Sequence, residues 1–117
     1  MKEEVVTSEA SKEYAEQLAR QLRKGFLAYC VLKICSHQPK YTSDIIMELR
    51  DADLVVVEGT IYPLLNKLQR DGLLTHEWQE SEQGPPRKYY KTTIYGEEVL
   101  KETLIKINDL NKTLGKL

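Results

Sequence analysis

A Gly-Pro-Pro triplet at residues 84–86 most constrains the fold of this chain, because a helix cannot run through it. In residues 74–79, before the triplet, apolar or ring-bearing side chains alternate with polar ones, and an alternating pattern also follows in residues 87–93. Such alternation is typical of β-strands. The sequence therefore predicts a two-stranded hairpin, with the triplet in its turn and two cations, Arg87 and Lys88, beside the turn.

The chain before the hairpin shows helical periodicity. Apolar residues recur at three- and four-residue intervals over 9–23, which predicts an amphipathic helix, and 26–35 is apolar nearly all round, as in a buried helix. Gly25 between them is expected to mark a bend or a close approach. Residues 41–50 predict a second core helix, and either hydroxyl residue near its start, at 42 or 43, can cap it.

Residues 59–74 predict a third helix with one apolar stripe. Pro63 is tolerated if Thr60 or a near neighbour is the N-cap, because the proline then falls within or just after the first turn. Asp71 and Gly72 end the helix, with the glycine at a left-handed stop. The stripe consists of Ile61, Leu64, Leu65 and Leu68.

Helices followed by a hairpin give the order of a winged helix-turn-helix. In that arrangement the third helix enters a major groove, which accepts one helix, and the hairpin, or wing, touches the flanking backbone. Phosphates attract cations, and five of them cluster in sequence on these two elements. They are Lys67, Arg70, Arg87, Lys88 and Lys91.

The C-terminal segment from Ile94 predicts a long helix with a seam resembling a coiled coil. Leu100, Ile107 and Leu114 repeat every seven residues, beside a companion row through Leu110. The seam could pack within the chain, but a single small domain offers no other surface of that length. Dimerisation is therefore predicted, through Leu100, Leu104, Ile107, Leu110 and Leu114.

Two separated motifs carry a resemblance to a known family. The stretch 59–74, GTIYPLLNKLQRDGLL, followed by 84–96, GPPRKYYKTTIYG, resembles the PadR-like transcriptional regulators. The resemblance implies a mainly α protein with a small hairpin: a homodimeric, DNA-binding winged helix, usually a repressor, that dimerises through its C-terminal helix. We expect an extra N-terminal helix in 1–24, the DNA-binding domain in 25–92 and the dimerisation helix in 93–117.

Several residues in these motifs are predicted to contact DNA. Tyr62 is either a DNA-facing hydroxyl or a core aromatic, Thr60 is a cap and a possible phosphate donor, and Lys67 and Arg70 could also simply solvate a helix face. One of the two tyrosines at 89–90 should lie in the core, because they point to opposite faces of a strand. The predicted DNA-binding set is Thr60, Tyr62, Asn66, Lys67, Arg70, Arg87 and Lys88.

An effector site rests mostly on the family resemblance. Three aromatic residues between the dimerisation helix and the DNA-binding core could hold a small flat aromatic compound: Trp78, Tyr29 and Tyr14. Packing between wing and core is the alternative for Trp78.

Composition and spacing exclude other classes. With 17 Lys plus Arg against 18 Asp plus Glu, the net charge is −1, so only the placement of charge can indicate a nucleic-acid partner. No nucleophile–base pair, phosphate loop or paired carboxylates suggest an enzyme, and no cofactor is expected. The cysteine and histidine spacing matches no common zinc pattern.

No apolar run could span a membrane, and a cytoplasmic protein is expected. The alternative function is a winged helix that binds proteins and not DNA.

Overall fold

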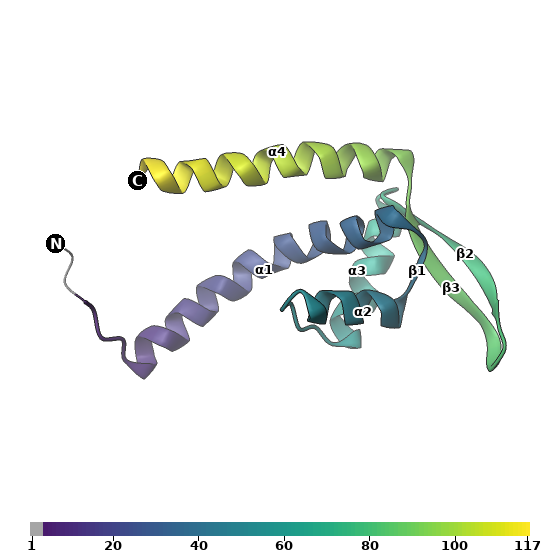
Figure 1. Cartoon of the computed structure of the whole chain (residues 1–117), viewed down its shortest axis with the longest axis horizontal. Coiled ribbons are helices and arrows are strands. Elements are labelled where there is room, and N and C mark those ends of the chain that lie inside the picture. Colours follow the sequence, from purple (N-terminus) through teal and green to yellow (C-terminus); the bar gives the residue numbers. More distant parts are fainter. Residues whose placement is uncertain (1–3) are drawn as a thin grey trace.

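The computed structural model describes residues 4–117. Its helices are α1 (Glu9–His37), α2 (Thr42–Asp51), α3 (Glu58–Arg70) and α4 (Ile94–Lys116), and its strands are β1 (Lys40–Tyr41), β2 (Leu74–Ser81) and β3 (Gly84–Thr92). The strands form one antiparallel sheet in the order β1-β3-β2, at the end of the molecule where the helices meet (Figure 1). The predicted winged helix is confirmed, and its sheet has one strand more than the predicted hairpin, because the short β1 pairs with β3.

α1 is a single helix about 43 Å long. It passes through Gly25 without interruption, and a Cβ at that position would meet no atom within 4 Å. The close approach is therefore absent at Gly25, which leaves the alternative of a bend. One glycine costs a helix only about 1 kcal/mol relative to alanine, and the buried second half of α1 outweighs that cost. The expected division between residues 24 and 25 thus falls inside a continuous helix.

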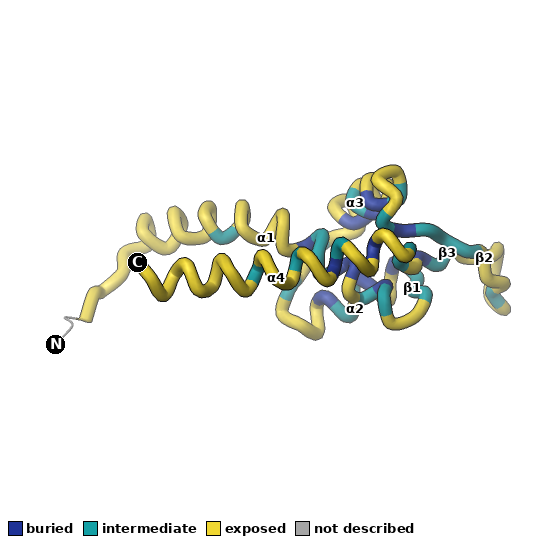
Figure 2. Tube along the Cα trace, turned by 90° about the horizontal axis from the view of Figure 1, so that it is seen from above, coloured by how far each residue is buried: buried dark blue, intermediate teal, exposed yellow. Residues whose placement is uncertain are grey.

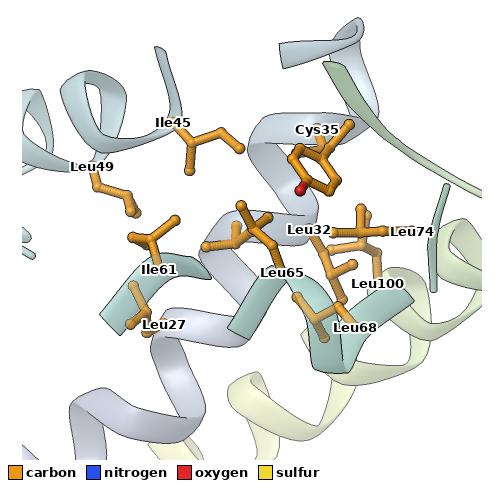
Figure 3. Packing of buried hydrophobic residues seen from close by; sticks show 12 residues of the cluster. Leu27, Leu32, Cys35, Ile45, Leu49, Ile61, Leu65, Leu68, Leu74 and Leu100 are labelled. Atoms are coloured by element: carbon orange, nitrogen blue, oxygen red, sulfur yellow. The ribbon is translucent and has the colours of Figure 1, made fainter. Parts of the chain in front are cut away.

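The hydrophobic core lies where the second half of α1 meets α2, α3, the sheet and the start of α4 (Figure 3). Each helix contributes residues spaced three or four apart, as expected of one buried face. The buried apolar residues are Leu27, Val31, Leu32, Cys35, Ile45, Leu49, Ile61, Leu65, Leu68, Leu74, Tyr90 and Leu100.

The predicted cap of α2 is wrong. The helix begins at Thr42 with Tyr41 as its N-cap, and the Asp44 carboxylate accepts a hydrogen bond of 3.1 Å from the Tyr41 amide. Thr42 is buried inside the first turn instead. The acidic residue in the first turn therefore does the capping that was assigned to a hydroxyl.

α3 also begins earlier than predicted. Its N-cap is Val57, so Thr60 is the third residue of the helix and not the cap. Pro63 consequently lies in the second turn. It has no amide hydrogen to donate to the carbonyl of Gly59, four residues earlier. The helix ends as predicted, with Gly72 at a φ of 80°.

The turn of the hairpin lies at 82–83, just before the Gly-Pro-Pro triplet, which belongs to β3. Gln79 pairs with Arg87, and Ser81 pairs with Gly84, so one residue on β2 faces both prolines. Prolines have no amide hydrogen to donate to the hydrogen-bond ladder of the sheet. Because the register is irregular at this point, the two prolines are not required to donate. The triplet was thus wrongly placed in the turn.

The molecule is elongated, with principal extents of 60 × 30 × 21 Å. Its radius of gyration is 17.7 Å, whereas a compact domain of this length has about 13 Å. The first half of α1 and the second half of α4 extend away from the core and are exposed almost throughout (Figure 2). Both carry apolar side chains that water surrounds: Tyr14, Leu18, Leu22, Leu104, Leu110 and Leu114.

Candidate nucleic-acid interface

α3 has two chemically distinct faces. Ile61, Leu65 and Leu68 are buried. Tyr62, Asn66 and Arg70, spaced four residues apart, are exposed. Tyr62 is 45% exposed, so it is not a core aromatic. The outer face of α3 therefore offers a phenol, an amide and a guanidinium in one strip, all of which can donate hydrogen bonds.

The two other candidates on α3 flank this strip. Thr60 is exposed in the first turn. The ammonium of Lys67 lies 2.6 Å from a carboxylate oxygen of Asp71, and both side chains are well exposed. An exposed ion pair of this kind contributes at most about 1 kcal/mol. A phosphate could therefore take the place of Asp71 at little cost.

The two cations of the wing, Arg87 and Lys88, lie on opposite faces of the sheet. The guanidinium carbon of Arg87 lies 4.8 Å from the ring centroid of Tyr41, and the ammonium of Lys88 lies 5.1 Å from that of Tyr90. Neighbouring residues of a strand point to opposite faces, so each cation lies over a tyrosine on a different side of the sheet. The sequence analysis placed both beside the turn, and they are separated because both belong to β3.

The next two residues of β3, Tyr89 and Tyr90, lie on opposite faces of the strand, and one of them is in the core, as predicted. Tyr90 is 3% exposed and belongs to the core, whereas Tyr89 is half-buried. The Tyr89 ring lies 5.8 Å from that of Tyr41, which faces it across the β1–β3 pair. This face of the sheet thus carries Tyr41, Tyr89 and Arg87 together.

The other face of the hairpin is tied to α3. His76 Nδ1 and Gln69 Oε1 lie 3.2 Å apart, a hydrogen bond that joins β2 to the last turn of α3. Two residues further along β2, Trp78 meets the His76 ring edge-on at 6.0 Å and is 64% exposed. The predicted packing of Trp78 between wing and core is wrong, because most of its side chain is open to solvent.

A family model and the solved structures agree with this geometry. The model described as the transcriptional regulator PadR-like family matches residues 31–102, more than half of the chain. The chain belongs to the PadR-like family.

Three solved structures illustrate how similar the chain is to other members. A PadR-like transcription factor from Bacteroides fragilis shares 50% identity, with a TM-score of 0.74 over 86% of this chain and 97% of that one. A family member from Eggerthella lenta shares 32%, with a TM-score of 0.84 over 93% and 96%. One from Bacillus cereus shares 33%, with a TM-score of 0.72 over 82% and 94%. No curated protein matches. As a member of this family, the chain is a transcriptional regulator and not an enzyme.

The dimerisation residues predicted for this PadR-like chain fall into two groups. Leu100 is 8% exposed, in the core of its own chain (Figure 3), and Ile107 is half-buried. Leu104, Leu110 and Leu114 are exposed. The first turns of α4 pack on α1 and the sheet, which explains why the predicted seam begins inside the monomer. Leu100 therefore has little surface left for a partner.

The predicted effector residues do not gather within one chain. Tyr14 and Tyr29 are fifteen residues apart on α1, or about 22 Å along the helix axis. Trp78 belongs to the wing, at the opposite end of the molecule from the start of α1 (Figure 1). Two open hollows of about 390 and 350 Å³ are lined by none of the three.

The cysteines show no sign of metal chemistry. Burial, with a smaller contribution from Glu48, raises the pKa of the Cys35 thiol to about 12, and burial also raises the pKa of Cys30. A protonated thiol is a poor metal ligand. Within the described part of the chain, no three metal-binding side chains come together. None of the described helices is long and apolar enough to cross a membrane.

Proposed function

We propose that this PadR-like regulator is an effector-responsive repressor that binds operator DNA in the cytoplasm as a homodimer. The exposed strip of Tyr62, Asn66 and Arg70 on α3 carries the proposal, since the opposite face of that helix is fixed in the core. A major groove about 12 Å wide accepts one such helix. Tyr62 and Asn66 of the strip can then reach the edges of the bases, which distinguish one sequence from another.

Phosphate contacts would hold the helix in register. Arg70 in the strip and Thr60 and Lys67 beside it can supply such contacts on α3, and Arg87 or Lys88 can do so on the wing, according to which face of the hairpin meets DNA. The net charge of −1 provides no general attraction to DNA. Binding therefore depends on these local groups and should weaken steeply as salt is added.

Base recognition by α3 is tested by Tyr62→Ala and Asn66→Ala. We expect each change to alter the order of preference among operator variants, by about 1–3 kcal/mol where a good base contact is lost. The measurement is a set of binding titrations with a selected operator and its single-base variants at one salt concentration.

Arg70→Ala is the matched control on the same helix. It should weaken all sequences about equally, because phosphate contacts carry no sequence information. If Tyr62→Ala and Asn66→Ala also weakened every sequence equally, both residues would position the helix and not read bases. A chain that bound no DNA at any salt concentration would favour the alternative, a winged helix that binds proteins.

The homodimer is supported by the exposed apolar residues on the projecting parts of α1 and α4. A second chain could cover both projecting parts. A compact dimer would then explain why the radius of gyration of a single chain exceeds that of a compact domain. Two copies would also present two α3 helices, which suits half-sites one helical turn, about 34–36 Å, apart. A dimer bound across a promoter would block transcription by occupying it.

An effector would bind where a second chain closes a pocket against α1. Tyr29 stacks on Phe26, with ring centroids 6.4 Å apart, and Tyr14 is exposed further along the same helix. A ligand can release DNA only if it binds the DNA-free arrangement more tightly. We expect flat aromatic compounds to lower operator affinity, and Tyr29→Ala to abolish the effect while leaving DNA binding intact. A broad set of such compounds that never changes the affinity would remove the support for an effector.

A further inference from the structure

The hairpin presents two faces of different character. The inner wing face carries His76, Trp78, Lys88 and Tyr90, and the outer wing face carries Tyr41, Glu77, Arg87 and Tyr89. The register assigns them: Trp78 stands opposite Lys88, and His76 stands opposite Tyr90, while Glu77 and Gln79 stand opposite Tyr89 and Arg87. Residues directly opposite one another project from the same face.

The inner wing face continues the surface of α3. The His76–Gln69 hydrogen bond joins the two elements, and Gln69 is the neighbour of Arg70. Tyr90 anchors the base of this face in the core, and the Lys88 ammonium lies over its ring. Beyond the core, Trp78 and Lys88 therefore project on the side where the sheet contacts α3.

The outer wing face lies beside carboxylates. Three of them, on Asp44, Glu48 and Asp51 of α2, line a hollow together with Tyr89, and Glu77 lies on the sheet itself. Lys40 at this hollow is paired with Glu48 at 3.0 Å. Arg87 and Lys91 are the other cations on this face of the sheet. A phosphate backbone would meet repulsion here that it would not meet beside the Lys88 side chain.

We propose that the inner wing face is the side of the hairpin that meets DNA, and that Trp78 is a further DNA-contacting residue. The proposal rests on the DNA binding proposed above. The indole packs against a deoxyribose and its Nε1–H donates to a backbone oxygen, while Lys88 neutralises a phosphate. These contacts add affinity without sequence preference, because sugar and phosphate are the same at every base pair. They also give a role to a tryptophan that is 64% exposed.

The chain contains a single tryptophan, so its fluorescence reports Trp78 alone. We expect saturating operator DNA to change the emission of the wild-type protein and to protect it markedly from quenching by acrylamide. Binding itself is followed separately, by the anisotropy of labelled DNA. If DNA binds and quenching stays unchanged, the inference is overturned and the proposed function stands. If no DNA binds, the proposed function fails, and the inference fails with it.

A matched pair of variants tests which face is used. Losing one phosphate contact from each of two wings should reduce the salt slope by about 1.8. We expect this reduction for Lys88→Ala with both operator and random DNA, and almost none for Arg87→Ala. Trp78→Ala should weaken both DNAs by the same factor, with unchanged thermal unfolding. A reduced slope for Arg87→Ala and an unchanged one for Lys88→Ala would show that the outer wing face meets DNA instead.

Discussion

We expect Leu110→Asp combined with Leu114→Asp to convert the protein into monomers and to weaken operator binding by about 10²–10⁴-fold. Both side chains are exposed on the projecting part of α4, so the fold of each chain does not depend on them. In a dimer they would be covered, and burying two carboxylates there is strongly unfavourable. A monomer binds only one half-site. It lacks the high effective concentration with which a dimer, once bound at one half-site, binds the second, and this sets the expected loss of affinity. Sedimentation and binding titrations measure the two effects.

The control places the same change in net charge on the opposite side of the helix. Asn108→Asp with Lys112→Gln alters the charge by −2, as the leucine pair does, but touches no apolar residue. This variant should remain a dimer and bind DNA with a modest loss. A leucine double variant that stayed dimeric at micromolar concentration would move the interface away from this part of α4.

We expect Gly96→Ala to destabilise the protein by about 1–3 kcal/mol. A Cβ at this position would lie 2.2 Å from the carbonyl oxygen of Leu73, a backbone atom that cannot swing aside. That oxygen accepts a hydrogen bond of 3.1 Å from the amide of Thr93. The Thr93 hydroxyl donates another, of 2.6 Å, to the carbonyl oxygen of Gly72. The start of α4 is therefore held tightly on the turn that ends α3. The measurement is urea unfolding at equal protein concentrations, since a dimer makes stability depend on concentration.

Gly25→Ala is the control for Gly96→Ala. Its Cβ would meet no atom of this chain within 4 Å, and alanine favours a helix over glycine by about 1 kcal/mol. Gly25→Ala should therefore leave the unfolding midpoint unchanged or raise it. If Gly96→Ala were as stable as the wild type, the close approach of α4 to the α3 turn would be wrong.

Local patterns predicted much of the fold. The three-to-four-residue stripe of α3 and the alternation of Tyr89 and Tyr90 follow from the geometry of one helix and one strand. Each sets which side is buried without reference to distant residues. The errors at the cap of α2 and at the Gly-Pro-Pro triplet share another cause. In each case a residue with a strong local preference was placed where that preference is best satisfied, and tertiary packing allowed a less favoured position.

The candidate site was predicted residue by residue but not as an arrangement. The sequence identified Tyr62, Asn66 and Arg70 on α3, and their common exposed face followed from spacing. Two facts about the wing could not be derived: that Arg87 lies over Tyr41, and that Trp78 is exposed. The first depends on Tyr41, which comes from a strand far away in sequence.

The sequence by itself determined the three later helices, the hairpin of β2 and β3, the buried face of α3 and membership in the PadR-like family, because these follow from short-range periodicity and contiguous motifs. Only the tertiary structure decided that Leu100 belongs to the core of its own chain, that the hairpin extends past the helices, and that His76 joins the wing to α3. These facts depend on where α4, the sheet and α3 meet in space. Such meetings are set by packing between residues remote in the chain, and no local pattern encodes them.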